Sequence, residues 1–256
     1  MAQKGILIDI TKCIGCQQCV SACKIQNNLP DTEETKLSIT AYTVVEEKEE
    51  RYVRRMCMHC KYPTCESVCP VGAFEHTKEG AVLYHAEKCI GCRYCMMACP
   101  FQAPRYEWAS RTPQIQKCKL CIERITIGKE TACTEACPVG ATIFGDYNDI
   151  LRIARQTVSA EPDKYVNHIY GENEVGGTSI LYISDVPFEK LGFKTNLGTQ
   201  KLPELTWSAL SKIPSVVAVG GTLLYGIWWI TNRRKEVIEF ERKMKESQTN
   251  NPDEEN

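Results

Sequence analysis

The longest uncharged stretch of the chain runs from Ile213 to Asn232 and is bounded by Lys212 and Arg233. Its twenty residues are about the length that a helix needs to cross the hydrocarbon core of a bilayer. The segment YGIWW lies near its C-terminal end, and aromatic side chains favour the membrane–water interface. We therefore expect a transmembrane anchor at residues 206–232 rather than a buried helix of a soluble domain.

The charges that flank this stretch predict its orientation. Two cations precede it, Lys201 and Lys212. More follow it: Arg233, Arg234, Lys235, Arg242, Lys243 and Lys245. Because the more positive flank stays in the cytoplasm, we expect a single pass through the cytoplasmic membrane, with the preceding residues on the periplasmic side. Residues 233–256 would form a cytoplasmic polar tail, with disorder expected in KESQTNNPDEEN.

Three small residues of the apolar stretch, Ala218, Thr222 and Gly226, recur at every fourth position. This spacing places them in a row along one side of a helix, where small side chains allow a second helix to approach closely. Simple tolerance of small residues in lipid is the alternative. The row predicts contact with an integral membrane partner.

Weaker patterns predict further elements upstream. Apolar positions around Tyr42–Val45 and at Tyr52 and Val53 flank the charged run EEKEER, which predicts a β-hairpin with a solvated turn. A docking contact is the alternative for those charges. We expect an extension at residues 148–205, with a strand around Ile180–Ile183.

The extension is also expected to contain an amphipathic helix in NDILRIARQTVSA, capped by Asn148 or Asp149. The apolar side of this helix would consist of Ile150, Leu151, Ile153, Ala154 and Val158.

Composition narrows the function. The net charge of −1 over 256 residues gives no basic field for nucleic acid. Cysteine is exceptional, with 16 residues, yet the start MAQKGILIDITKC has neither an apolar signal region nor twin arginines. Disulfide scaffolds are usually short and secreted, and they do not explain cysteines separated by only two residues.

The sixteen cysteines fall into four groups of four. The groups are Cys13, Cys16, Cys19, Cys23; Cys57, Cys60, Cys65, Cys69; Cys89, Cys92, Cys95, Cys99; and Cys118, Cys121, Cys133, Cys137. The first and third groups share KCIGC, and the second and fourth end in CPVGA. This internal repeat indicates that a two-motif unit is used twice.

The spacing indicates [4Fe–4S] clusters. In the ferredoxin pattern C-x2-C-x2-C-x3-C, three nearby cysteines bind one cluster and the fourth binds another. A tetrahedral zinc site uses two C-x2-C pairs, not a triple and a remote single, so the spacing excludes zinc. Gly15 and Gly91 lie where the loops turn tightly. The repeat itself leaves two pairings open, one of neighbouring groups and one nested.

The cysteine register resembles that of four-cluster ferredoxin-type subunits of respiratory oxidoreductases. These include formate dehydrogenases, uptake-type [NiFe] hydrogenases and dimethyl sulfoxide or polysulfide reductases. The resemblance covers about residues 5–145. The segment VGGTSILYISDVPFEKLGF also resembles the extension of the membrane-anchored members of the family.

The resemblance implies nested pairing, with the first group joined to the fourth and the second to the third. Carried onto this sequence, the implied ligand sets are Cys13, Cys16, Cys19, Cys137; Cys57, Cys60, Cys65, Cys99; Cys89, Cys92, Cys95, Cys69; and Cys118, Cys121, Cys133, Cys23. Cys23 is followed by Lys24 where the simple ferredoxin pattern has proline. The implied fold is α+β, with two pseudo-symmetric dicluster ferredoxin-like units at residues 1–147.

The function implied is an electron-transfer subunit with four [4Fe–4S] clusters and no catalytic residues of its own. Its partners would be a catalytic subunit of the molybdopterin or [NiFe] type and an integral membrane subunit, quinone-reactive or a cytochrome b. Export alongside a catalytic partner with a twin-arginine signal would place the cluster domain outside. The alternatives are a reductase subunit with reversed electron flow and a membrane-tethered redox sensor.

Overall fold

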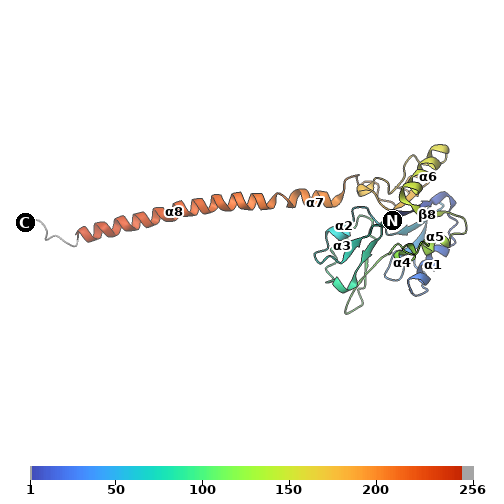
Figure 1. The fold of residues 1–256 in the computed structure, drawn as a ribbon, viewed down its shortest axis with the longest axis horizontal. Coiled ribbons are helices and arrows are strands. Elements are labelled where there is room, and N and C mark those ends of the chain that lie inside the picture. Colours follow the sequence, from blue (N-terminus) through green and yellow to red (C-terminus); the bar gives the residue numbers. More distant parts are fainter. Residues whose placement is uncertain (1, 250–256) are drawn as a thin grey trace, which may run out of the picture. The chain divides into compact units, whose positions relative to one another are not determined.

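The computed structural model describes residues 2–249 (Figure 1). The chain divides into two compact units, and the boundary along the sequence lies between Glu204 and Leu205. The first unit contains all the cysteines, together with the α6 helix and β9 strand of the expected extension. It has mixed helix and sheet, as the α+β prediction requires.

A three-stranded sheet, in the order β8-β1-β9, joins distant parts of the sequence. Strand β1 (Lys4–Asp9) pairs antiparallel with β8 (Thr142–Asp146) and parallel with β9 (Ile180–Ile183). The expected strand at Ile180–Ile183 is thus confirmed, whereas β1 and β8 are additions that the sequence patterns did not reveal. Through β9, the extension belongs to the same sheet as the start of the cysteine region.

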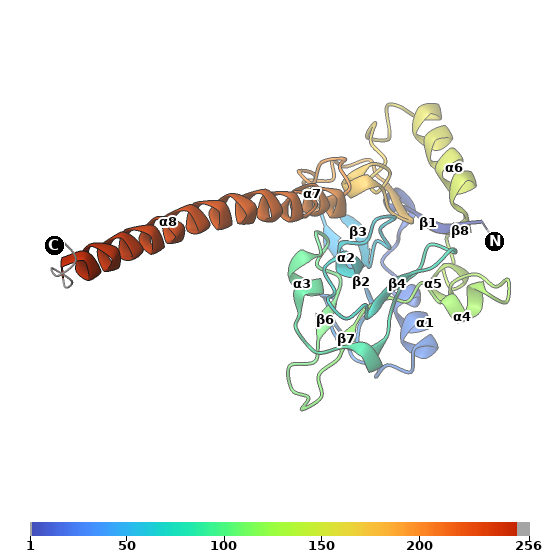
Figure 2. The ribbon, with the colours of Figure 1, turned by 60° about the vertical axis from the view of Figure 1, so that its left-hand side comes forward.

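Strand β1 is buried on both faces, which explains its continuous apolar sequence GILI. Alternate side chains of a strand point to opposite faces. Ile6 and Ile8 therefore pack into the core that contains several cysteines, and Leu7 packs into a second core together with residues of helix α6. Figure 2 shows α6 beside β1 and β8.

Helix α6 (Tyr147–Ala160) confirms the amphipathic prediction, because its buried face includes Ile150, Ala154 and Val158. The predicted cap is wrong. The helix already begins at Tyr147, so Asp146, the last residue of β8, occupies the N-cap position. The strand runs directly into the helix, which leaves Asn148 and Asp149 inside its first turn.

The predicted hairpin is also present, as β2 (Thr43–Lys48) and β3 (Arg51–Met56). Only Glu49 and Glu50 of the charged run form the turn, both with positive φ, and the rest extends the strands. The remaining hairpins are β4 (Phe74–His76) with β5 (Val82–Tyr84), and β6 (Arg105–Tyr106) with β7 (Ile115–Gln116).

Short helical segments connect these strands. They are η1 (Ile10–Lys12), α1 (Gln18–Gln26), α2 (Thr64–Ser67), η2 (Ala86–Lys88), α3 (Tyr94–Ala98), α4 (Ile122–Ile125), α5 (Ala132–Glu135) and η3 (Glu174–Gly176). Most of them begin or end beside a cysteine, so their role is to position the groups described below.

The second unit is helical. Helix α7 (Leu202–Leu210) ends before Ser211, and α8 runs from Ile213 to Thr249. The break falls within the expected anchor and precedes Pro214, which has no N–H for a bond to the preceding turn. Among the described residues, Leu202–Ser247 is the one helical stretch long and apolar enough to cross a membrane, and its apolar 18-residue window has a mean hydropathy of 1.6 with no part buried within the protein.

The expectation of disorder in KESQTNNPDEEN is wrong for the described part of that segment, because α8 continues to Thr249. Ion pairs one turn apart support the polar end of the helix, such as Arg242 with Glu246 at 3.7 Å and Lys243 with Glu239 at 3.5 Å. Residues 250–256 of the segment lie outside the described residues.

Candidate iron–sulfur sites

The first and third cysteine groups follow the same backbone path, as their shared KCIGC motif predicts. In each group, a short 3-10 turn (η1 or η2) leads into the first cysteine, and the third cysteine lies in the helix that follows (α1 or α3). Gly15 and Gly91 both have φ +71° in the intervening loops. This left-handed conformation allows a tight turn, and in the second loop it lets the N–H of Gly91 donate to the sulfur of Cys89 at 3.4 Å.

The second and fourth groups resemble each other in the same way. Each has its third cysteine in a one-turn helix, Cys65 in α2 and Cys133 in α5, and its fourth just beyond. The chain then turns back over the fourth cysteine, so that the N–H of Ala73 donates to the sulfur of Cys69 at 3.2 Å. The sequence repeat is therefore also a structural repeat.

One small cavity collects cysteines from the two ends of the cysteine region. It is lined by three thiols of the first group and one of the fourth: Cys13, Cys16, Cys19 and Cys137. The sheet explains this meeting, because β1 leads into the first group and its neighbour β8 follows the fourth. Arg54 of β3 also lines this cavity.

A second cavity collects the remaining cysteines of the same two groups. It is lined by Cys23, Cys118, Cys121 and Cys133. Cys23 lies at the far end of α1 from Cys19, and α1 packs against α5, so one helix presents a thiol to each cavity. Arg54 lines this cavity as well.

The second and third groups also approach each other. After burial, the largest influences that raise the pKa of Cys60 come from Cys57, Cys99 and Cys65. For Cys95, the nearby thiols are Cys89, Cys92 and Cys69. Each of these two neighbourhoods thus contains three cysteines of one group and the fourth cysteine of the other.

Burial is the main cause of the shifted thiol pKa values. It raises the pKa of Cys23 and of Cys95 to about 12, and nearby thiols add to the rise. Burial also acts on Cys137, but backbone N–H groups, with those of Thr142 and Ala141 foremost, outweigh it and lower the pKa of this thiol. Crowded, desolvated thiols of this kind become thiolates when they bind a metal.

The donor set fits iron–sulfur clusters. Within residues 2–249, no three His, Cys, Asp or Glu side chains converge as the ligands of a single metal ion do. Thiols surround each of the two cavities instead, and a [4Fe–4S] cube takes one thiolate at each of its four irons. The N–H groups that approach the sulfurs of Cys69 and Cys89 are of the kind that tunes cluster potentials.

The sequence analysis did not single out two buried cations near the cysteines. Arg54 is only 2% exposed and Lys117 only 5%. The Lys117 ammonium donates to the carbonyl oxygen of Cys118 at 2.9 Å, and its charge favours the thiolate of Cys65. The alternation of strand RYVRRM could have revealed Arg54, because it places this arginine and Arg55 on opposite faces, so that one of them points inward.

His59, between Cys57 and Cys60, is fully buried. Its Nδ1 accepts the N–H of Val82 at 3.0 Å, and Nε2 has no hydrogen-bond partner among the described residues. Burial, followed by the charge of Lys117, holds the pKa of His59 well below its usual range. The imidazole is therefore neutral, with its proton on Nε2, and fixes the loop that carries two cysteines to strand β5.

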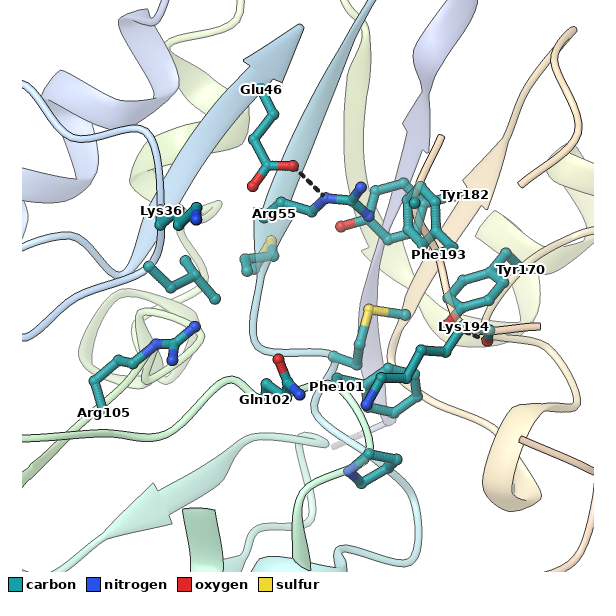
Figure 3. A pocket seen from close by; sticks show the side chains of 15 residues that line it. Lys36, Glu46, Arg55, Phe101, Gln102, Arg105, Tyr170, Tyr182, Phe193 and Lys194 are labelled. Atoms are coloured by element: carbon teal, nitrogen blue, oxygen red, sulfur yellow. Dashed lines mark hydrogen bonds and ion pairs between the residues drawn. The ribbon is translucent and has the colours of Figure 1, made fainter. Parts of the chain in front are cut away.

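A cavity of about 330 Å³ is shown in Figure 3. It adjoins the second and third groups, because Met56, Met58 and Pro100 of its lining are sequence neighbours of Cys57 and Cys99. Its lining has no cysteine and combines the cations Lys36, Arg55, Arg105 and Lys194 with Glu46 and the aromatic rings of Phe101, Tyr170, Tyr182 and Phe193. Arg55 is held there by Glu46, with Nε 3.2 Å from the carboxylate, and it lies 4.1 Å from the ring centroid of Phe193.

The expected helix-contact residues lie on α8. Ala218 and Thr222 are exposed, and a side chain added at Gly226 would meet no atom within 4 Å. The Thr222 hydroxyl donates to the carbonyl oxygen of Ala218 at 2.8 Å, so this row presents little polar surface. Nothing in the described part of the second unit covers it.

The repeated cysteine loops and their thiol-lined cavities define a ferredoxin-type iron–sulfur protein. Residues 12–73 and 48–147 each match a family described as a 4Fe-4S dicluster domain. Two such domains with sixteen cysteines are consistent with four [4Fe–4S] clusters.

Relatives of which this chain covers more than two thirds identify the family. Hydrogenase-2 operon protein HybA of Escherichia coli O157:H7 is 34% identical over 255 residues, with 81% of this chain and 76% of the relative covered. The iron-sulfur subunit of the nitrate-inducible formate dehydrogenase of Escherichia coli K12 is 35% identical, with 71% and 68% covered. The formate dehydrogenase iron-sulfur subunit of Haemophilus influenzae is 32% identical, with 85% of this chain and 77% of the relative covered. The chain belongs to the family of iron–sulfur electron-transfer subunits of the hydrogenase and formate dehydrogenase type.

Proposed function

We propose that the sixteen cysteines bind four [4Fe–4S] clusters in nested sets. The sets are Cys13, Cys16, Cys19, Cys137; Cys57, Cys60, Cys65, Cys99; Cys89, Cys92, Cys95, Cys69; and Cys118, Cys121, Cys133, Cys23. The observation that carries this proposal is the pair of cavities in which cysteines of the first and fourth groups meet. The mutual influence of the remaining thiols supports the other two sets.

The proposed role is to relay electrons between a catalytic subunit and a membrane subunit. When bound, a [4Fe–4S] cluster accepts and releases one electron at a time. The chain's own residues hold four such carriers within one compact unit and surround them with backbone N–H donors and buried cations. We assign no catalytic residue to this chain, so substrate oxidation belongs to the partner.

The names of the relatives support two types of catalytic partner. Names of similar proteins refer to hydrogenase-2 and to formate dehydrogenase. We propose a [NiFe] or a molybdopterin catalytic subunit accordingly. On the other side of the relay, we propose a quinone-reactive integral membrane subunit, with or without cytochrome b.

We further propose a division of labour along the chain. Residues 1–147 hold the clusters, 148–205 brace them through β9, 206–232 anchor the chain in the cytoplasmic membrane, and 233–256 face the cytoplasm. The cations after the span support this orientation, because positive flanks remain inside. The exposed row Ala218, Thr222 and Gly226 would contact a helix of the membrane partner.

The test is iron analysis and electron paramagnetic resonance (EPR) on the chain purified without oxygen. We expect iron and sulfide for four clusters, reduction at several potentials, and no oxidation of hydrogen or formate by the chain alone. Iron for two clusters, or zinc in place of iron, would contradict the ligand sets. A reporter fused to the C-terminus tests orientation separately, since a periplasmic signal would reverse the proposed topology.

A further inference from the structure

Two adjacent arginines of strand β3 face opposite sides of the hairpin and have very different surroundings. Arg55 lines the open cavity of Figure 3, where the Glu46 carboxylate balances its charge. Arg54 points the other way, into the protein, and is 2% exposed. The charge of Arg55 therefore has a carboxylate partner, whereas the charge of the neighbouring Arg54 has none among the described residues.

The guanidinium of Arg54 is fixed by neutral groups. Its Nε donates to the Thr43 hydroxyl at 3.0 Å, and that hydroxyl in turn donates to the carbonyl oxygen of Arg55 at 3.0 Å. Tyr182 of β9 donates to the carbonyl oxygen of Arg54 at 2.9 Å, which ties the strand backbone to the sheet. The orientation of the side chain is therefore determined, but none of these contacts neutralises its charge.

No carboxylate forms an ion pair with Arg54 among residues 2–249, and its Nη1 is buried without a hydrogen-bond partner. An isolated buried charge is strongly unfavourable, so native proteins retain one where an opposite charge faces it. After burial, the groups with the largest influence on Arg54 are Cys133 on α5 and Cys19 on α1, followed by the hydroxyl of Tyr182. The charge of Arg54 also acts on Cys13, beyond η1.

Cys13 and Cys19 line one of the two cavities in which the first and fourth groups meet, and Cys133 lines the other. Arg54 lines each cavity, and after burial the largest influences on its charge come from Cys133 and Cys19. Four thiolates around a [4Fe–4S] core leave a net negative charge at each site. One guanidinium between two such sites supplies the countercharge that the surrounding protein lacks.

We propose that Arg54 is a shared countercharge for two clusters, those of Cys13, Cys16, Cys19, Cys137 and of Cys118, Cys121, Cys133, Cys23, and that it raises both reduction potentials together. The proposal rests on the ligand sets given above. Reduction adds a negative charge to a cluster, and a fixed cation nearby stabilises the reduced form. Because Arg54 lines both sites, its charge acts on both clusters at once.

The experiment is an EPR-monitored redox titration of the complex purified without oxygen, comparing Arg54→Gln, Arg54→Lys and the control Arg55→Gln. Glutamine removes the charge and keeps a polar side chain, whereas lysine keeps the charge. We expect two of the four midpoint potentials to fall in Arg54→Gln and most of that shift to be absent in Arg54→Lys. Arg55→Gln should leave both potentials in place.

The two affected signals are identified as those lost in Cys19→Ala and in Cys133→Ala. Four loaded clusters with no shift, a shift in one potential alone, or an equal shift in all four would overturn the proposal and leave the ligand sets intact. Wild-type protein with iron for fewer than four clusters would instead overturn the ligand sets.

Iron content decides the outcome if Arg54→Gln does not load fully. Loss of half of the wild-type iron, with the other two signals retained, supports a charge shared by two sites. If all iron is lost, Arg54→Lys decides: restored loading supports the role of the charge, and failure to restore it shows that the position matters only for packing.

Discussion

Gly171 is the position where a single methyl group should cost the first unit the most stability. It lies between α6 and β9 with φ +98°, a conformation that side chains of L-residues rarely adopt. A Cβ at this position would overlap the carbonyl oxygen of Ile180 and would lie 2.7 Å from the hydroxyl of Thr178. Both neighbours are fixed, because Ile180 belongs to the sheet and the single hydroxyl proton of Thr178 is shared between the carbonyl oxygens of Ile180, at 2.7 Å, and Gly171, at 3.1 Å.

Two terms give the expected magnitude for Gly171→Ala. The positive φ costs a non-glycine residue about 1–2 kcal/mol, and forcing an extra group into a packed site typically costs about 1–3 kcal/mol. Their sum lowers the free energy of unfolding by about 2–5 kcal/mol. For a unit of this size, each kcal/mol lowers the melting temperature by about 2–4 °C.

The assay is thermal unfolding of the cluster-loaded protein, followed by circular dichroism at one scan rate, because loss of clusters makes unfolding irreversible. Gly198→Ala is the matched control. Gly198 also has a positive φ, +65°, but a Cβ there would meet nothing within 4 Å. Equal melting temperatures for the two variants would refute the argument, since the contact with Ile180 would then contribute nothing.

Three further predictions test the clusters and the anchor. Cys23→Ala and Cys118→Ala should each remove the same EPR signal, and the double variant should lose no more iron than either single one; additive loss would favour pairing of neighbouring groups. Gly226→Leu should reduce co-purification of the membrane partner, whereas Gly220→Leu, on the opposite side of α8 from Thr222, should not; equal effects would argue against the row. A stop codon after Glu204 should move the chain, expressed without partners, from the membrane to the soluble fraction with its iron content unchanged. Continued sedimentation with membranes would show that the anchor lies elsewhere.

The sequence predicted the cysteine loops, the hairpin and the amphipathic helix because each of these depends on residues that are close together in the chain. The KCIGC and CPVGA repeats set short loops whose geometry is determined by nearby residues, and the loops at Gly15 and Gly91 indeed follow the same path. The hairpin at Thr43–Met56 and the helix at Tyr147–Ala160 likewise follow from alternation and amphipathic spacing.

Long-range features could not be predicted in this way. Strand β1 is a short apolar run, which does not reveal that its partners lie about 140 and 175 residues later in the chain. Similarly, RYVRRM shows three arginines, but only the fold shows that Arg54 faces two groups of cysteines while Arg55 pairs with Glu46. The helical end of α8 was missed because polar composition suggested disorder, whereas an established helix continues readily into an ion-paired segment.

The pairing of β1 with β8 also bears on the order in which the protein matures during synthesis. If the nested sets hold, the inner groups are complete once Cys99 has left the ribosome, whereas Cys13, near the start, waits for Cys137. The outermost thiols therefore stay without their last companion for more than a hundred residues of translation. Pairing of β1 with β8 would bring Cys13 and Cys137 together and so complete the last ligand set, which makes strand β1 necessary for the final step of cluster assembly.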